Sequence, residues 1–542
     1  MSLKTYLSEA LGEVLSSLEL PKKLIIIEHS KNPEFGDFSC NVALILAKEV
    51  KINPVQLAEK INDNIALNPD WISSTNVTPP GFINFFISIK FYQSFLSMIL
   101  DQGNNFGKSS VGISKTANVE FVSANPTGPL TVGHGRQAVL GDTIANILEW
   151  HEYDVTREYY YNDAGRQMRM LSDSVSARYF QEINPQVEFP EEGYKGEYIR
   201  DIAKYILQTH GNNLKADNPI FRKEAEESIF QDIKRTLLSL GIQHDSFVNE
   251  KSFFESGSIE KTLKDLKTLS LIYEKDGATW FKATACGKTQ DRVYIKNTGE
   301  PTYRLPDTAY HRNKFERNYN LIIDIFGADH VDTFPDVLAA LETLDYDMSS
   351  IKVCIHQFVT LIRGGKKVKM STRKAEFITL QELIDQLESD VVRYFFIMRS
   401  MNSHLNFDLD LATDQSEKNP VFYLQYAHAR ICNILRYAEK GGYKLDEDFN
   451  AKLLDNPLEI DLIKSLHQFP EIMLNVLESL EPQTIATYLQ SLARKYHKFY
   501  ADCRVVSEKK SLTNSRLHLI CTVKLVLANG LKILGISAPE RM

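Results

Sequence analysis

A strand followed by a Pro- and Gly-rich turn and a long helix limits the possible folds of this 542-residue chain more than any other segment. Val119 to Val122 has the apolar, β-branched character of a buried strand, and His134 to Trp150 has the apolar spacing of a helix. Between them, Asn125-Pro126-Thr127-Gly128-Pro129 turns the chain. Such a unit directs backbone N–H groups and the positive end of the helix dipole towards one point, where an anion can bind.

Strand and helix signals continue to alternate after this unit. A strand pattern at 155–161 follows the helix, and strand patterns return at 321–326 and 353–355. Strands joined through helices pair in parallel, because each crossover returns the chain to the same edge of the sheet. The alternation therefore predicts a doubly wound parallel sheet at 115–405, with a helix-rich insertion at about 175–290.

The two ends of the chain differ from this central part. Residues 1–110 combine helical patterns with two strand patterns, which predicts a small α/β domain, and a polar stretch at 101–107 reads as a linker. From 410 to 542 the strand signals stop and helical periods follow one another, which predicts an all-helical bundle. The expected fold class is therefore α/β, with domains at 1–110, 115–405 and 410–542.

Charge and cysteine usage narrow the class of protein. The formal net charge of −8 does not predict nucleic-acid binding, which depends on Lys and Arg, although a whole-chain average leaves individual surfaces open. No run approaches the roughly 18 apolar residues that cross a bilayer, and the N-terminus lacks the features of a signal peptide. Six cysteines without any C-x-x-C pair argue against disulfides or a thiolate zinc site. We expect a cytoplasmic protein.

The start of the long helix is the clearest candidate for chemistry. Gly133 and Gly135 leave the backbone open to a flat base or a phosphate, and His134 can donate a hydrogen bond to a phosphate oxygen as charge develops. For the Gly-His-Gly triplet alone, a surface loop with a histidine is the favoured alternative. The preceding strand and the Asn-Pro-Thr-Gly-Pro turn favour the phosphate site.

Segment 120–142 resembles the class I aminoacyl-tRNA synthetases, and in particular the arginyl-tRNA synthetase family. Thr131-Val132-Gly133-His134 matches the His-x-Gly-His signature, with Thr131 in place of its first histidine. The resemblance covers essentially the whole chain and implies a Rossmann-like catalytic domain. It also implies that Thr131, Gly133, His134 and Gly135 handle ATP, a substrate that arrives with Mg²⁺. No tightly bound cofactor and no resident metal are expected.

A second signature follows about 230 residues later. The basic loop 364–374 is by itself typical of a solvated surface, but a cluster of cations can also neutralise a departing polyphosphate. Lys369-Met370-Ser371 matches the start of the Lys-Met-Ser-Lys-Ser loop, and the last two residues of that signature differ here. The resemblance implies that Lys369 stabilises the transition state, with Lys367 or Lys374 in the role of the missing lysine.

A pocket for arginine should offer carboxylates and other acceptors, because arginine is a planar cation with five donors. Tyr303 and Asp307 lie four residues apart, on one face of a predicted helix, and Glu120 and Asn125 flank the turn after the first strand. Taken alone, Asp307 could be a helix cap and Glu120 a surface residue. The resemblance implies that these four residues bind L-arginine, with Asp307 facing the guanidinium.

Two further segments match the family: 161–167, whose Asn162 and Asp163 could equally be a helix cap, and 326–330. Asp329 and His330 close another predicted strand, and the resemblance implies that they contact substrate and the ATP ribose. Since a set of buried acceptors rejects ligands that lack matching donors, no separate editing activity is expected.

Both ends of the chain carry candidates for RNA contacts. Aromatic and basic residues interleaved on a helix can stack on bases and pair with phosphates. Tyrosines three residues apart, such as Tyr423 and Tyr426, are however more often core residues. The resemblance implies that Tyr426, Arg430 and Met542 contact the anticodon region, and that Phe82 and Asn84 meet the tRNA elbow. An edge strand is the alternative for the last two.

The expected reaction is ATP-dependent activation of L-arginine to arginyl-adenylate and its transfer to the 2′-OH of the terminal adenosine of tRNA(Arg), by a monomer that binds neither DNA nor membranes. A cysteine-specific synthetase is the rival enzyme, but it requires zinc ligands that the scattered cysteines do not supply. A catalytically inactive RNA-binding relative is the rival of another class, and Thr131 is its only support.

Overall fold

The computed structural model describes residues 3–30, 32–163, 165–368, 378–445 and 449–542. The N-terminal α/β domain consists of α1 (Leu3–Ser17), β1 (Ile27–His29), η1 (Pro33–Phe35), β2 (Phe38–Cys40), α2 (Val42–Val50), α3 (Pro54–Asn64), β3 (Ile72–Thr78) and β4 (Phe82–Ile87). Its antiparallel sheet has the strand order β1-β2-β4-β3. Ile83 and Phe85 of β4 are fully buried, so one face of this sheet packs into the domain core.

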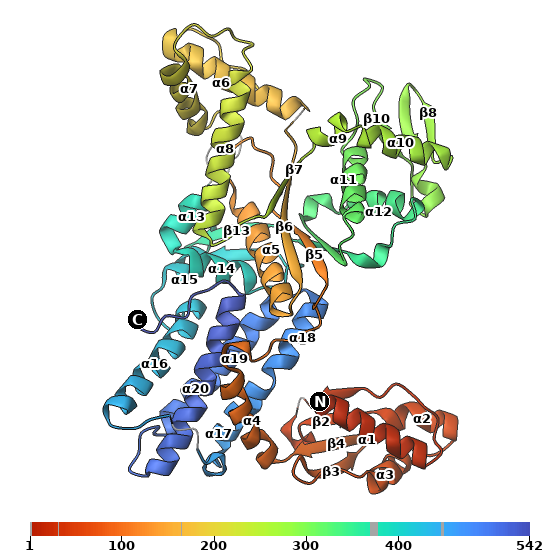
Figure 1. The fold of residues 1–542 in the computed structure, drawn as a ribbon, viewed down its shortest axis with the longest axis vertical. Helices are drawn as coiled ribbons and strands as arrows, with labels where there is room; N and C mark the ends of the chain where they lie inside the picture. The colour runs from red at the N-terminus through yellow and green to blue at the C-terminus, as the bar shows by residue number, and fades with distance from the viewer. Residues whose placement is uncertain (1–2, 31, 164, 369–377, 446–448) are drawn as a thin grey trace.

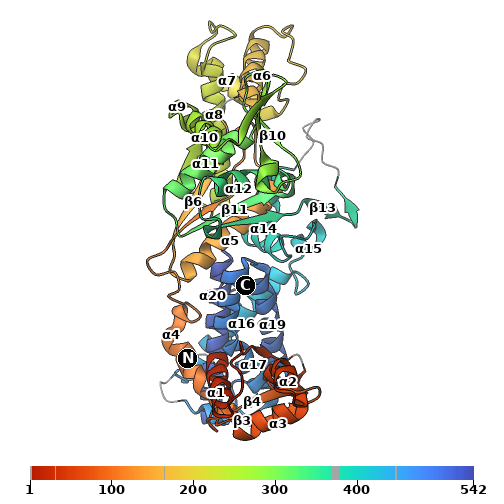
Figure 2. The ribbon, with the colours of Figure 1, turned by 90° about the vertical axis from the view of Figure 1, so that its right-hand side faces the viewer.

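Helix α4 (Ile89–Gln102) and η2 (Gly103–Asn105) join this domain to the C-terminal helices. The stretch at 101–107 is therefore a packed connection: Phe106 is buried, and the side-chain amide of Asn529 donates to the carbonyl oxygens of Gly103 and Phe106. Glu471 adds an ion pair with Lys4 and a hydrogen bond with Nε2 of His29 at 2.9 Å. In both ribbon views the N-terminal domain accordingly lies beside the C-terminal helices, far from the parallel sheet (Figures 1 and 2).

The central parallel sheet consists of β5 (Thr116–Glu120), β6 (Asp154–Tyr161), β7 (Ser246–Asn249), β11 (Leu321–Gly327) and β12 (Ile351–His356), in the order β12-β11-β5-β6-β7. Side chains of β5 alternate between its two faces. Val119 joins the core that includes α5 (Val132–Trp150), whereas Glu120 accepts hydrogen bonds from α11 (Arg304–Glu316). The predicted doubly wound parallel sheet is confirmed.

Two insertions interrupt the sheet. The first is helical: α6 (Gly165–Ile183), α7 (Glu197–His210) and α8 (Ile220–Ser239). The second contains α9 (Lys251–Glu255), α10 (Ser258–Thr268), β8 (Ile272–Lys275), β9 (Ala278–Phe281), η3 (Ala283–Cys286) and β10 (Arg292–Ile295), whose strands form an antiparallel sheet. Where one helix-rich insertion was expected at about 175–290, the structure returns to the sheet at β7. This four-residue, half-buried edge strand leaves only a weak apolar pattern in the sequence.

The end of the central region carries the smaller elements before and after the second signature. They are η4 (Ala328–His330), α12 (Phe334–Thr343), η5 (Met348–Ser350), β13 (Val359–Arg363), β14 (Lys366–Lys367), α13 (Leu380–Leu387), α14 (Ser389–Ile397), β15 (Leu405–Asp408) and α15 (Leu409–Thr413). β13 pairs with β14 and β15 in a separate small sheet.

The C-terminal domain consists of α16 (Pro420–Lys440), η7 (Ala451–Leu453), α17 (Pro457–His467), α18 (Phe469–Ser479), α19 (Gln483–Asp502) and α20 (Lys510–Ile533). The described residues beyond 413 contain no strand, which confirms the expected helical bundle. None of the helices that the structure describes is long and apolar enough to cross a membrane.

Candidate active site

The strand order creates a crevice between β5 and β11. From β5 the chain runs to β6 on one side, whereas β11 lies on the other side of β5, so the connections diverge at the carboxyl ends of these two strands. Ligands of open parallel sheets bind at such points. A cavity of about 650 Å³ lies here, and its lining includes Glu120 at the end of β5, Gly327 at the end of β11 and His356 at the end of β12.

The turn after β5 has a strained backbone. Val122 and Ser123 have φ angles of 69° and 43°, in the left-handed region that a β-branched residue adopts only under constraint. The Oγ of Ser123 donates to Glu120 at 2.8 Å and accepts from the backbone N–H of Tyr160 at 3.1 Å, which holds the turn in place. Strain of this kind concentrates at functional sites. Here the constrained turn leads directly to Asn125, which lines the cavity.

The first turn of α5 presents a defined donor at His134. The backbone N–H of Thr131 donates to Nδ1 of His134 at 3.2 Å, so the neutral imidazole carries its proton on Nε2. Burial lowers the pKa of His134 and favours this neutral form. Since Thr131, Gly133 and His134 all line the cavity, Nε2–H and the free amides of the helix start are the donors available to an anion.

The two glycines beside His134 have different surroundings. A Cβ atom at Gly133 would approach only the Thr131 hydroxyl, at 3.7 Å, so this position is open on the cavity side. A Cβ atom at Gly135 would lie 2.5 Å from Leu380 and 3.1 Å from Phe396. Gly135 therefore lets α5 pack closely against α13 and α14, which differs from the expected approach of ATP to its backbone.

Two acids in the cavity have no lysine or arginine partner among the described residues. Asp307 on α11 and Glu250, which immediately precedes α9, both line the cavity. Among the described residues, Glu250 accepts from two neutral groups, the hydroxyl of Tyr160 at 3.0 Å and the amide of Asn162 at 2.7 Å. Burial raises the pKa of Asp307 to about 6 and that of Glu250 to about 7, and the charge of Asp307 adds to the second rise. A bound cation would stabilise the ionised form of both carboxylates and lower both pKa values.

Glu120, by contrast, is already neutralised. Its carboxylate is buried and accepts from the ammonium group of Lys314, from the Tyr310 hydroxyl at 3.0 Å and from Ser123. Lys314 also donates to Asp324. Burial raises the pKa of Asp324, but Lys314 and His311 outweigh it and bring that pKa to about 2. Glu120 thus belongs to a compensated network that forms the wall of the cavity.

The same network excludes an obvious metal site. Ligand atoms of Glu120, His311 and Asp324 lie within 4.8 Å of one another, a spacing that could suit a metal ion. The Lys314 ammonium already bridges the two carboxylates. A divalent cation would therefore have to displace a buried positive charge, so we assign no metal to this cluster.

The end of β11 supplies the residues expected beside the ribose. Asp329 and His330 lie in η4 and both line the cavity. His330 stacks on Phe326, with ring centroids 5.3 Å apart. A Cβ atom at Gly327 would lie 2.5 Å from Asp329 Oδ1, so a side chain at this position would displace the Asp329 carboxylate. The predicted pair is therefore brought to the same crevice as His134.

The second signature follows a hairpin whose first residue lines this cavity. Lys367 is exposed on β14, in the hairpin that begins with β13. Val359, the first residue of β13, lines the cavity. Lys369, Met370, Ser371 and Lys374 lie outside the described residues.

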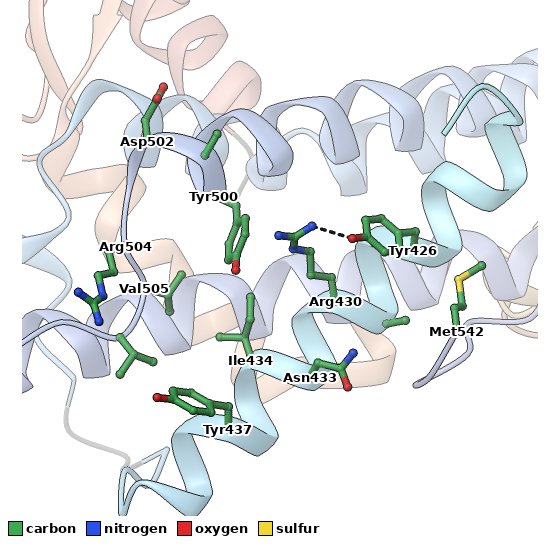
Figure 3. A pocket seen from close by; sticks show the side chains of 13 residues that line it. Tyr426, Arg430, Asn433, Ile434, Tyr437, Tyr500, Asp502, Arg504, Val505 and Met542 are labelled. Atoms are coloured by element: carbon green, nitrogen blue, oxygen red, sulfur yellow. Dashed lines mark hydrogen bonds between the residues drawn. The ribbon is translucent and has the colours of Figure 1, made fainter. Parts of the chain in front are cut away.

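The C-terminal residues predicted to meet RNA surround a second cavity, of about 740 Å³, which we call the α16 pocket. Arg430 lies between two tyrosines: its guanidinium donates to the Tyr426 hydroxyl at 2.7 Å and lies 4.3 Å from the ring centre of Tyr500 (Figure 3). Met542 lines the same pocket and is 53% exposed. Tyr437, 69% exposed, adds an open aromatic face.

Phe82 and Asn84, the two residues of the N-terminal domain predicted to meet the tRNA elbow, differ from each other in exposure. Phe82 is partly exposed at the start of β4. Asn84 is 1% exposed, and its side-chain amide donates to Asn76 at 2.9 Å and Thr78 at 3.0 Å. Direct base contact by Asn84 was expected, but its amide is committed to these neighbouring side chains, so it supports the strand surface.

Several cavity residues were missed from the sequence. Glu250 stands in no recognised motif, and His356, whose pKa burial lowers to about 4, lies at the end of an ordinary strand. Tyr310 in the cavity lining and the buried Lys314 beside Glu120 could have been identified from the sequence, because they follow Asp307 by three and seven residues and so share its helix face.

Comparison with known families gives three matches in chain order. The model described as "Arginyl tRNA synthetase N terminal domain" matches residues 1–87, "tRNA synthetases class I (R), catalytic domain" matches residues 95–395, and "DALR anticodon binding domain" matches residues 424–542.

Individual relatives agree with these matches. The chain is 47% identical to the arginine–tRNA ligase of Salinibacter ruber over the full length of both chains, and 48% identical to that of Desulfotalea psychrophila, covering 95% of this chain and 94% of the relative. The arginyl-tRNA synthetase structure from Thermus thermophilus has a TM-score of 0.76, with 21% identity and full coverage of both chains, and shows the same fold. The chain therefore belongs to the arginyl-tRNA synthetase family.

Proposed function

We propose that this chain activates L-arginine with ATP and transfers it to the terminal adenosine of tRNA(Arg). The observation that carries the proposal is that Asp307 and Glu250, which have no lysine or arginine partner among the described residues, share a single cavity with the start of α5. The acids suit a planar cation, and the helix start suits a polyphosphate. Family membership and the names of the relatives support the same reaction.

The guanidinium of arginine is placed against Asp307 and Glu250. Asp307 keeps the role expected from the sequence, with Tyr303 one helical turn before it and Asn125 across the cavity. The second acid is Glu250 and not Glu120, because Lys314 already neutralises the Glu120 carboxylate. A ligand without the fork of N–H donors would leave these buried acceptors unpaired.

In the first step, an oxygen of the arginine carboxylate attacks the α-phosphate of ATP in line, and pyrophosphate leaves with Mg²⁺. The O–P bond to arginine forms as the P–O bond to pyrophosphate breaks, without a covalent intermediate on the protein. Nε2–H of His134 and the amides at Gly133 stabilise the charge that develops on the phosphate oxygens. We assign Asp329 and His330 to the ribose, and the family resemblance assigns Lys369 to stabilising the leaving pyrophosphate.

In the second step, the 2′-OH of the terminal adenosine attacks the carbonyl carbon of arginyl-adenylate. The ester bond forms, AMP leaves, and the hydroxyl proton passes to the departing phosphate or to solvent. No acid or base of the protein is required for the proton balance.

The RNA is placed against both ends of the chain. The α16 pocket offers Tyr426, Tyr437 and Tyr500 for base stacking and Arg430 for cation–π or phosphate contact. Met542 lies at the mouth of the same pocket. Phe82 of the N-terminal domain is placed at the tRNA elbow.

The test is arginylation of a tRNA(Arg) transcript by the purified chain with ATP and Mg²⁺, followed as labelled arginine in acid-precipitable RNA. Charging should require arginine, ATP and tRNA together, and lysine, citrulline and cysteine should not replace arginine. ATP–pyrophosphate exchange should disappear when tRNA is omitted, and mischarged tRNA should not be deacylated. Failure to charge tRNA(Arg) in the presence of tRNA binding would favour the inactive relative instead. Size-exclusion chromatography tests the expected monomer.

A further inference from the structure

The C-terminal tail, residues 537–542, runs along α16 and is hydrogen-bonded to it before it reaches the α16 pocket. The side chain of Gln425 donates to the carbonyl oxygen of Ser537 at 3.1 Å, and His428 Nδ1 donates to that of Pro539 at 2.9 Å. Arg436 donates to the carbonyl oxygen of Glu540 at 2.8 Å. Tyr426 on the helix and Met542 at the end of the tail both line the pocket. A ligand in the pocket therefore contacts α16 and the tail together.

Both walls of the pocket are tied to one side chain of the catalytic domain, Asp390. Its carboxylate accepts from the backbone N–H of Ser537 at 3.2 Å and from the Ser537 hydroxyl. It also accepts from the Gln425 amide at 2.7 Å. These donors are neutral, and no lysine or arginine among the described residues pairs with Asp390. Asp390 is thus the point at which the tail, α16 and α14 meet.

One turn further along α14, Arg393 extends the connection to α5. Its buried guanidinium donates to the carbonyl oxygen of Leu534 at the end of α20, to that of Leu240 at the end of α8, and to Asp142 of α5 at 2.7 Å. A Cβ atom at Gly535, where φ is +68°, would lie 2.2 Å from this guanidinium. The glycine therefore allows the C-terminal domain to close directly over Arg393.

The last turn of α14 packs against the start of α5. The ring of Phe396 lies where a Cβ atom at Gly135 would be only 3.1 Å away. Gly135 is the residue after His134, so α14 packs directly beneath the turn that presents the His134 donor. A small displacement of α14 cannot be absorbed by empty space here, because close-packed interiors transmit strain.

We propose that Asp390 is a positioning residue that transmits occupancy of the α16 pocket through α14 to the first turn of α5. This inference rests on the proposed function, in which anticodon nucleotides occupy that pocket. A ligand that draws α16 and the tail together shifts Gln425 and Ser537, which are hydrogen-bonded to Asp390. Asp390 then moves α14, and with it Arg393 and the Phe396 ring that packs against Gly135. Recognition in the C-terminal domain then sets the geometry of His134 in the catalytic domain, which is the requirement for coupling between two sites.

The test is a cycle of two changes, Asp390→Asn in the protein and replaced anticodon nucleotides in a tRNA(Arg) transcript. An asparagine keeps the size of the side chain but has one acceptor oxygen, so at least one of the ties to Gln425 and Ser537 is lost. Single-turnover arginylation gives the rate for each of the four combinations, and fluorescence titration gives the Kd of each tRNA.

In the wild-type protein, replacing the anticodon nucleotides should lower the arginylation rate about tenfold or more, within the range of about 5- to 150-fold typical of coupled sites. In Asp390→Asn the rate with the native transcript should fall towards that of the altered one, and the remaining anticodon effect on rate should be below about threefold. The effect of the anticodon on Kd should persist, because the pocket itself is unchanged. Equal anticodon effects on rate in both proteins would overturn the proposal, since a purely structural role slows both tRNAs alike.

Asp385→Asn is the matched control. Asp385 lies on the neighbouring helix α13, and in an exposed pair it accepts from the amide of Gln381 at 2.8 Å. Its rates and its anticodon effect should equal those of the wild type.

Two further variants keep the test decisive if Asp390→Asn does not fold. Gln425→Met and Ser537→Ala remove donors from the other side of the junction and leave Asp390 in place. Both should reduce the anticodon effect on rate, and an unreduced effect in both would overturn the proposal. If the wild type does not charge tRNA(Arg), the proposed function fails. If it charges but shows no anticodon effect on Kd or rate, the assignment of the α16 pocket fails. If the anticodon effect survives in the variants, the role of Asp390 alone fails.

Discussion

Replacing Asp307 with asparagine tests the arginine slot most directly. The amide keeps the size of the side chain and one acceptor oxygen, but it removes the negative charge that faces the cavity. Because Asp307 has no lysine or arginine partner among the described residues, its loss should not unpair any group of the free protein. The change leaves no described buried cation without its partner, so the variant should fold.

The magnitude follows from the perturbed acidity of this carboxylate. Its pKa rises from 3.8 to about 6 because of burial. At about 1.4 kcal/mol per unit, the ionised form is disfavoured by about 3 kcal/mol in the empty cavity. A guanidinium that pairs with Asp307 recovers this free energy, and the variant loses it. A loss of about 3 kcal/mol lowers kcat/KM for arginine about 100- to 200-fold, within the range of about 2–5 kcal/mol seen when one partner of a buried charge pair is removed.

The assay is arginylation with arginine varied at saturating ATP and tRNA, with the KM for ATP measured separately. The KM for ATP should stay within about twofold of the wild-type value, because the helix start that meets the phosphates is unchanged. Asp332→Asn is the control, since Asp332 is exposed close to the same crevice but does not line the cavity. An Asp307→Asn variant with wild-type kcat/KM for arginine would refute the assignment of the slot. An equal loss in Asp332→Asn would show that the effect is not specific to it.

Three further outcomes are expected. Burial raises the pKa of Glu250 to about 7 and that of Asp307 to about 6, so both acids ionise as the pH rises, and the KM for arginine should fall between about pH 5 and pH 8. Glu250→Gln should remove the upper part of this pH dependence and raise the KM at least about tenfold; a pH profile identical to that of the wild type would contradict the role of Glu250. His134→Ala should lower the rate of adenylate formation about 100- to 1,000-fold with little change in the KM for arginine, measured by pyrophosphate exchange in the presence of tRNA, and a variant with full exchange activity would disprove the donor role. Lys314→Met leaves the buried carboxylates of Glu120 and Asp324 without their cation, so it should cost about 3–5 kcal/mol and lower the midpoint of thermal unfolding, which an unchanged midpoint would rule out.

Elements with a strong local pattern could be predicted from the sequence. The sequence pattern predicts a strand at 82–87 and a helix at 483–502, and strand β4 and helix α19 have these bounds, because alternation with period 2 and apolar spacing near 3.6 are properties of a short segment alone. The helical pattern at 458–480 predicts one helix, but the structure has two, α17 and α18. Pro470 lies in the first turn of α18, where its missing N–H is tolerated, and in the interior of a single helix it would break the hydrogen-bond ladder.

The sequence by itself determined the parallel sheet, the strand–turn–helix unit and the residue types that meet at the crevice, since each follows from patterns a few residues long. Only the tertiary structure decided which carboxylate lacks a cationic partner in the protein and can pair with a bound cation. Glu120 and Glu250 look alike in the sequence, but Lys314, 194 residues from Glu120, neutralises the first, and no described cation reaches the second. The ionisation and availability of a carboxylate depend on the charges that surround it in space, and those neighbours come from distant parts of the chain.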